Sequence, residues 1–112
     1  MPHCVVNLMG QFVLVVYVPE SHLEILKAAL FNAGCGKMGK YSHCCWQVLG
    51  QGQFKPEADS NPTIGEVSQL THVSEYRVEC VLDSADFKSV KSALLIAHPY
   101  EVPAYHFYEV IV

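Results

Sequence analysis

Residues 97–105 (AHPYEVPAY) hold the densest group of side chains in this sequence that could do chemistry. They carry an imidazole, two phenols and a carboxylate, on His98, Tyr100, Tyr105 and Glu101. Each of the two prolines fixes its own φ and pushes the preceding residue toward an extended backbone. A turn stiffened in this way holds its side chains in place. We call residues 97–105 the proline turn and predict that it contributes to a ligand site.

A second group of such side chains lies near the middle of the chain, at Tyr41, His43 and Cys44. Imidazole, thiolate and carboxylate groups together can bind a divalent or transition metal ion. The alternative is that the two histidines only hydrogen-bond to backbone groups and fix the turns. The metal hypothesis lacks a paired-cysteine or helical His-x-x-x-His spacing, and it uses His43, Cys44, His98 and Glu101. The wider set of ligand-site candidates is Tyr41, His43, His98, Tyr100, Glu101 and Tyr105.

Two other kinds of site have weaker support. Cys44 or Cys45 could act as a nucleophile with a histidine base, but a cysteine in a strand is more often a small core residue. Residues 50–52 (GQG) resemble a phosphate-binding loop only in their two glycines, and no helix N-terminus follows them. We therefore predict no catalytic residue and assign no cofactor beyond the metal hypothesis.

Composition limits the class of protein. The chain has 112 residues, enough for one domain, which we expect to span residues 1–112 with a loosely ordered lead-in at 1–10. A net charge of −4 argues against nucleic-acid binding, and no apolar stretch approaches the ~20 residues of a membrane helix. Five cysteines without framework spacing indicate reduced thiols and a cytoplasmic location. Only 16% of residues are charged, so we expect part of the surface to be buried against another copy.

The elements that must position the candidate residues follow from apolar patterning. Residues 12–18 predict a strand that is apolar on both faces, and residues 20–33 predict a helix that ends at Gly34. The remaining predicted elements, in chain order, are a strand at 41–49, a turn or bulge at 50–52, a short return strand at 53–55, a long loop at 57–65, a strand ending at 76–82, a helix at 87–97 with Asp83 as its N-cap, and a final strand at 104–112.

An internal repeat relates the two halves of the chain. Residues 26–33 (LKAALFNA) align without gaps with residues 90–97 (VKSALLIA), and Lys, Ala, Leu and Ala are identical between them. Each half is therefore strand–helix–strand, and two such split units interleave into one sheet. The predicted fold is α+β and ferredoxin-like: a double split β-α-β with a four-stranded antiparallel sheet, two helices on one face, and an extra hairpin or loop in the middle. We also expect the proline turn to face residues 41–45.

Six separated motifs resemble a known family: residues 18–23 (VPESHL), 33–34 (AG), 39–44 (GKYSHC), 52–56 (GQFKP), 61–65 (NPTIG) and 97–105. Together they resemble the domain inserted in the GTP cyclohydrolase 1 type 2 homologue family, also called NGG-interacting-factor-three-like or YqfO-like. That inserted domain is similar to the PII signalling and CutA proteins, which are ferredoxin-like trimers. The resemblance therefore implies a trimer-like assembly.

The resemblance also limits which residues can be assigned a role. The dinuclear metal site of the larger family lies in flanking halves, so none of its catalytic or metal residues can be carried over. We expect a free-standing version of the insert. The family motif has a second glutamate after Glu101, where this chain has Val102.

Two functional hypotheses follow. We expect a non-catalytic, homo-oligomeric PII/CutA-like module, with a trimer favoured over a dimer, that binds or senses a small ligand. The alternative is a metal-binding protein that uses the His43/Cys44 and His98/Glu101 segments. Whether His43 and His98 converge on one site decides between these hypotheses, and the sequence leaves it open.

Overall fold

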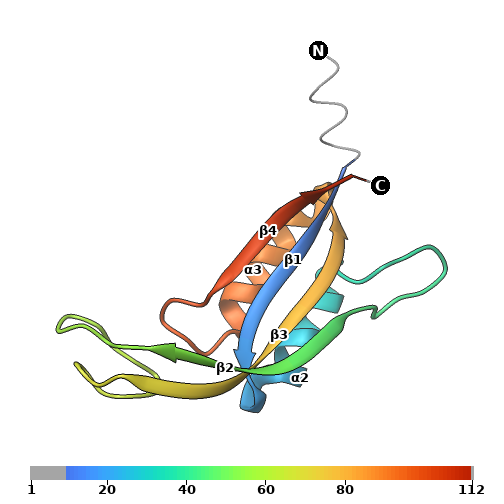
Figure 1. Ribbon diagram of the computed structural model, residues 1–112. Helices are drawn as coiled ribbons and strands as arrows, with labels where there is room; N and C mark the ends of the chain where they lie inside the picture. Colours follow the sequence, from blue (N-terminus) through green and yellow to red (C-terminus); the bar gives the residue numbers. More distant parts are fainter. Residues whose placement is uncertain (1–9, 112) are drawn as a thin grey trace.

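The computed structural model describes residues 10–111, which form one sheet and two helices (Figure 1). The lead-in predicted at residues 1–10 lies, except for Gly10, outside the described residues. No helix within residues 10–111 is long and apolar enough to cross a membrane. The elements in chain order are β1 (Gln11–Pro19), the 3-10 turn η1 (Glu20–His22), α2 (Leu23–Asn32), β2 (Trp46–Phe54), β3 (Thr71–Asp83), the 3-10 turn η2 (Ser84–Asp86), α3 (Phe87–Ala97) and β4 (Tyr105–Val110).

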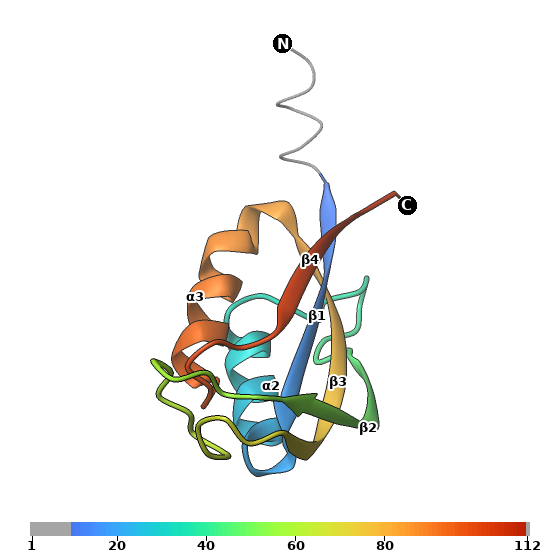
Figure 2. The ribbon, with the colours of Figure 1, turned by 60° about the vertical axis from the view of Figure 1, so that its left-hand side comes forward.

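The four strands form one sheet in the order β2-β3-β1-β4, and every neighbouring pair is antiparallel. Both helices cover the same face of this sheet (Figure 2). The two helices run in opposite directions, so the end of α2 lies beside the start of α3. There the Ser89 hydroxyl of α3 donates a 2.9 Å hydrogen bond to the carbonyl of Ala33, the residue that follows α2. The ferredoxin-like double split β-α-β predicted from the repeat is confirmed.

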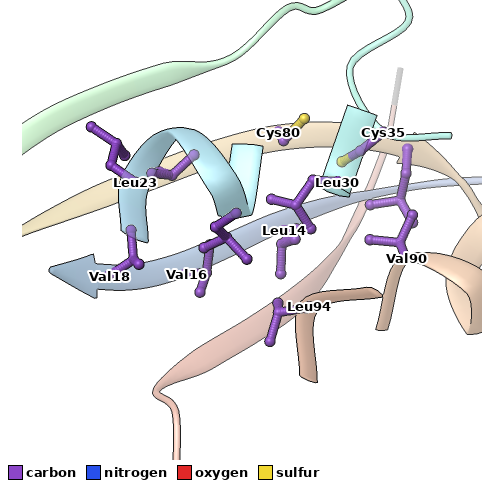
Figure 3. Packing of buried hydrophobic residues seen from close by; sticks show 12 residues of the cluster. Leu14, Val16, Val18, Leu23, Leu30, Cys35, Cys80, Val90 and Leu94 are labelled. Carbon is purple, nitrogen blue, oxygen red and sulfur yellow. The ribbon is translucent and has the colours of Figure 1, made fainter. Parts of the chain in front are cut away.

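The core lies between the helices and the sheet face that they cover (Figure 3). Alternate residues of the two central strands point into it, because side chains alternate between the faces of a strand. Burying each leucine or valine side chain contributes roughly 1.5–3 kcal/mol. The fully buried members include Leu14, Val16 and Val18 of β1, Val78 of β3, Leu26 and Leu30 of α2, and Val90 and Leu94 of α3.

The β2–β3 hairpin extends past the end of β1. Pairing of β2 with β3 runs from Trp46↔Glu79 to Phe54↔Thr71, whereas β1 pairs with β3 only as far as Pro19↔Glu75. The hairpin therefore projects from the sheet (Figure 1), which confirms the extra hairpin or loop in the middle of the chain. The turn predicted at 50–52 and the return strand predicted at 53–55 are wrong, since residues 50–54 continue β2.

The strand predicted at residues 41–49 begins only at Trp46. Residues 41–45 instead belong to a loop in which Tyr41 forms an isolated bridge with Met38 and His43 has a φ of 60°. A non-glycine residue in this left-handed region interrupts an extended strand. Asp83 does sit at the N-cap position of η2, but its side chain makes no capping hydrogen bond. It accepts a 3.2 Å hydrogen bond from the side chain of Gln11 instead.

The sheet face without helices carries a row of apolar side chains, as the patterning of residues 12–18 predicted. Val15 on this face is buried, while Trp46 is 57% exposed and Tyr108 is 55% exposed. We call this surface the open face. Its apolar members, placed there by the strand register, are Val13, Val15, Tyr17, Trp46, Val48, Phe54, Val73, Val81, Tyr108 and Val110. Glu75, Arg77 and Glu79 of β3 share this face.

Candidate ligand-binding site

A pocket of about 420 Å³ lies where the hairpin, the loop between β2 and β3, and the proline turn meet. This volume falls in the range of small-molecule sites. We call it the turn pocket. Its lining residues are Tyr17, Gln53, Phe54, Lys55, Pro56, Glu57, Ser60, Pro62, Thr63, Ile64, Val73, Glu75, Tyr100, Glu101, Val102 and Ala104.

His98 fixes the proline turn behind this pocket. Its side chain is buried at 7% exposure, and its backbone N–H donates to Leu94 at the end of α3. The imidazole Nε2 donates to the Tyr17 carbonyl at 2.6 Å, while Nδ1 accepts from the Tyr100 N–H at 3.2 Å. Burial lowers the pKa of His98, although the bond to the Tyr17 carbonyl opposes this shift. Both nitrogens are occupied, so His98 serves as a structural hydrogen-bonding group within this chain.

The loop between β2 and β3 is held against the proline turn by two hydrogen bonds. The Asn61 N–H donates to the Glu101 carboxylate at 3.0 Å, and the Thr63 hydroxyl donates to the Pro99 carbonyl at 2.9 Å. We call these two bonds the clasp. They bring together the motifs at 61–65 and 97–105, which are far apart in the sequence. The clasp therefore makes the loop one wall of the turn pocket.

Two polar groups in the pocket lack partners. The hydroxyl oxygen of Tyr100 is buried and forms no hydrogen bond in the described part of the chain. Its pKa is raised by burial first and by the charge of Glu75 second. The half-buried Glu75 side chain likewise has no hydrogen bond or ion pair to residues 10–111, and burial raises the pKa of its carboxyl group. Polar groups left in this condition cost free energy and mark a place for a ligand or water.

Gly52 allows Glu75 to occupy this position. A Cβ added at Gly52 would lie against the Glu75 carboxyl group, with its Cδ only 2.9 Å away. Glycine inside a strand often marks a close approach of this kind. Sequence reasoning missed Glu75 because it resembles an ordinary polar strand residue. The pair of glycines at 50 and 52, taken instead as a turn, was the signal that could have found it.

The structure places only two of the six ligand-site candidates in the lining of the turn pocket, Tyr100 and Glu101. Tyr41 is 76% exposed in the loop before β2, and Tyr105 packs against the core. His98 lies behind the pocket as described. His43 lines a separate, more open hollow beside α2, with its ring 4.9 Å from that of Phe31.

The four residues of the metal hypothesis are not brought together. His43 packs at the C-terminal end of α2, whereas His98 lies near its start, close enough for His22 to lower the pKa of His98. The Cys44 thiol donates to the Ser42 carbonyl. Within residues 10–111 no group of three or more His, Cys, Asp or Glu side chains is arranged to hold a metal ion. The expected proximity of the proline turn to residues 41–45 is wrong for the same reason.

Comparison with known structures identifies the fold. No family model matches the chain. CutA1 from Shewanella sp. SIB1 superimposes with a TM-score of 0.65 at 15% identity, over 91% of this chain and 82% of CutA1. CutA from Synechococcus elongatus superimposes with a TM-score of 0.67 at 15% identity, over 92% of this chain and 79% of that protein. With the double split β-α-β topology, these matches show that the chain has the CutA/PII-like, ferredoxin-like fold.

Sequence similarity narrows the identification. The chain resembles part of the GTP cyclohydrolase 1 type 2 homologues, the family that the six motifs predicted. It is 46% identical to the Bacillus subtilis homologue and 42% identical to the Mycobacterium leprae homologue, in each case over 97 residues and 87% of this chain. A Bacillus cereus protein related to NIF3 superimposes with a TM-score of 0.80 at 36% identity, covering 93% of this chain and 26% of that protein. The chain spans about a quarter of the length of the curated relatives it matches.

Proposed function

We propose that this domain is a non-catalytic, self-associating PII/CutA-like module that binds a small ligand in the turn pocket. The observation that carries the proposal is the turn pocket itself, in which a clasped loop encloses two polar groups without partners. Apolar walls with a few polar groups are typical of small-molecule sites. The site offers no nucleophile hydrogen-bonded to a base within the described residues, so ligand binding explains it better than catalysis.

Ligand binding can be tested by screening a library of small neutral, cationic and anionic molecules by ligand-observed NMR. Ile64 lines the pocket, and an Ile64→Trp substitution fills it. Val67 lies in the same loop outside the pocket, so Val67→Trp is the matched control. The proposal is supported if a molecule binds the wild-type chain and Val67→Trp but does not bind Ile64→Trp. A library without any molecule sensitive to Ile64→Trp would contradict it.

The open face supports self-association. It combines a buried Val15 with the exposed apolar side chains of Trp46 and Tyr108, and such side chains on one sheet face are typical of a surface that another copy covers. The family resemblance implies three copies, so we propose a trimer built on the open faces. Sedimentation should give about three times the 12.5 kDa mass of one chain.

A matched pair of substitutions tests which face is involved. Trp46 on the open face and Ile25 on the outer side of α2 are almost equally exposed, at 57% and 59%. Trp46→Glu should reduce the mass to that of a monomer, because a carboxylate buried in an apolar interface is costly. Ile25→Glu should leave the trimer intact. If Ile25→Glu gave a monomer and Trp46→Glu a trimer, the interface would lie on the helices and not on the open face.

A further inference from the structure

The charged side chains that line the turn pocket are mostly acidic. Three glutamates line it against a single lysine, Lys55. Glu101 already accepts a hydrogen bond from Asn61 in the clasp. Glu57 lies exposed on the loop that forms one wall. Glu75 is the carboxylate that is both half-buried and without a side-chain partner in the described region.

The basic group nearest to Glu75 on its own strand is already engaged. Arg77 follows on the same face of β3, but its Nε donates to Glu79 at 3.0 Å and its Nη1 donates to the Tyr17 hydroxyl at 3.1 Å. The neighbouring Tyr100 supplies a phenol rather than a positive charge. The charge of Glu75 is therefore left uncompensated by the surrounding described groups, and a cation would relieve this.

The walls around Glu75 are apolar and partly aromatic. Phe54 contributes a ring, and a cation next to an aromatic face gains further attraction. The ring of Tyr17 also lines the pocket, but it already has the Arg77 guanidinium 5.9 Å from its centroid. A cavity of about 420 Å³ has room for an organic molecule and not only for an ion. The remaining apolar lining residues are Pro56, Pro62, Ile64, Val73 and Val102.

We propose that the turn pocket binds a small organic cation, an ammonium group on an apolar body, whose charge pairs with Glu75. This inference rests on the proposed ligand-binding function and names the chemistry of the ligand. The ammonium reaches Glu75 first, because the Tyr100 hydroxyl oxygen is sealed from solvent. A small movement of the Tyr100 side chain would then let that oxygen accept a second N–H.

Three probes of similar shape and different charge test the inference: 2-phenylethylammonium, 2-phenylethanol and 3-phenylpropanoate, titrated into the full chain and followed by NMR. The ammonium should bind about tenfold or more tightly than the other two, the difference expected for one charge-assisted hydrogen bond. Glu75→Gln should remove that preference. Glu66→Gln, an exposed change outside the pocket lining, should keep it.

The outcomes separate this inference from the function on which it rests. Equal or tighter binding of the alcohol or the carboxylate, abolished by Ile64→Trp, would overturn the cation inference and leave ligand binding standing. A preference for the ammonium that persists in Glu75→Gln would also overturn it. Failure of all three probes overturns the inference, while the proposed function then depends on the library screen.

Discussion

The imidazole of His98 donates a 2.6 Å hydrogen bond to the backbone carbonyl of Tyr17, and so joins the proline turn to the end of β1. The two residues come from opposite ends of the chain. Nδ1 of the same ring accepts the Tyr100 N–H, so one side chain connects α3, β1 and the lining of the turn pocket.

Replacing this imidazole should destabilise the fold. We expect His98→Ala to lower the free energy of unfolding by about 2 kcal/mol, because it removes two hydrogen bonds and leaves a buried space. Chemical denaturation measures the change. His72→Ala, at an exposed position of the hairpin, should change stability by less than about 0.5 kcal/mol. Equal effects at the two histidines would show that the His98 bond contributes nothing.

The titration of His98 should make the stability of the fold depend on pH. The pKa of His98 is lower in the folded chain than its ordinary value of 6.5, through burial and, to a smaller degree, the nearby His22. The folded state therefore binds fewer protons than the unfolded state below about pH 6.5, and stability falls as the pH decreases through that point. Denaturation between pH 7.5 and 5 should show this loss, and His98→Gln should reduce it.

Glu75 should act on stability in the opposite direction. Its pKa is raised in the folded chain by burial, so the folded state favours the protonated carboxyl group and loses stability as the pH rises through that pKa. Glu75→Gln should therefore raise the melting temperature at pH 7. The gain should shrink as the pH falls below the ordinary carboxyl pKa of 4.5, because the wild-type carboxyl group then becomes neutral in both states. If Glu75→Gln instead had a lower melting temperature than the wild type at pH 7, the Glu75 carboxylate would be making a stabilising interaction in the folded chain.

Tyr100 and Tyr17 form a matched pair of phenols. The Tyr100 hydroxyl has no partner in the described residues, whereas the Tyr17 hydroxyl accepts from Arg77. Tyr100→Phe should leave the free energy of unfolding unchanged or raise it by up to about 1 kcal/mol, because no bond is lost with the buried hydroxyl. Tyr17→Phe should lower it by about 0.5–1 kcal/mol. If Tyr100→Phe lowered the free energy of unfolding more than Tyr17→Phe, the Tyr100 hydroxyl would not be the group without a hydrogen bond.

The clasp should control opening of the pocket wall. Glu101→Ala removes the acceptor of the Asn61 N–H, so amide exchange at Asn61 should accelerate several-fold while exchange in β1 stays unchanged. Glu101→Gln retains an acceptor oxygen and should exchange more slowly than Glu101→Ala. Acceleration of the same size in β1 would mean that the clasp supports the whole fold.

The architecture could be predicted because it depends on local patterns and a repeat. The match of residues 26–33 with 90–97 requires two strand–helix–strand units, and few topologies accommodate them. The start of β2 could not be predicted, because Tyr41 and His43 have the composition of a strand but the left-handed φ of His43 interrupts it. Composition carries no information on that dihedral angle.

The candidate site was predicted in part. The proline turn does line a pocket, through Tyr100 and Glu101. Its partner was misassigned, because the clasp joins two irregular loops, and no periodicity relates Asn61 to Glu101. Glu75 was missed because its importance depends on the space left by Gly52 on the neighbouring strand.

The opposite directions of α2 and α3 have a consequence for how substitutions combine. Ala33 at the end of α2 bonds to Ser89 at the start of α3, so the segments that follow the two helices leave from opposite ends of the layer. The length of α2, about 15 Å at 1.5 Å per residue, separates the surroundings of His43 from those of His98. Sites that far apart without shared partners have additive energies. Substitutions in the loop at residues 41–45 and in the turn pocket should therefore affect stability independently. A double-mutant cycle between Cys44 and Glu101 should give a coupling energy near zero.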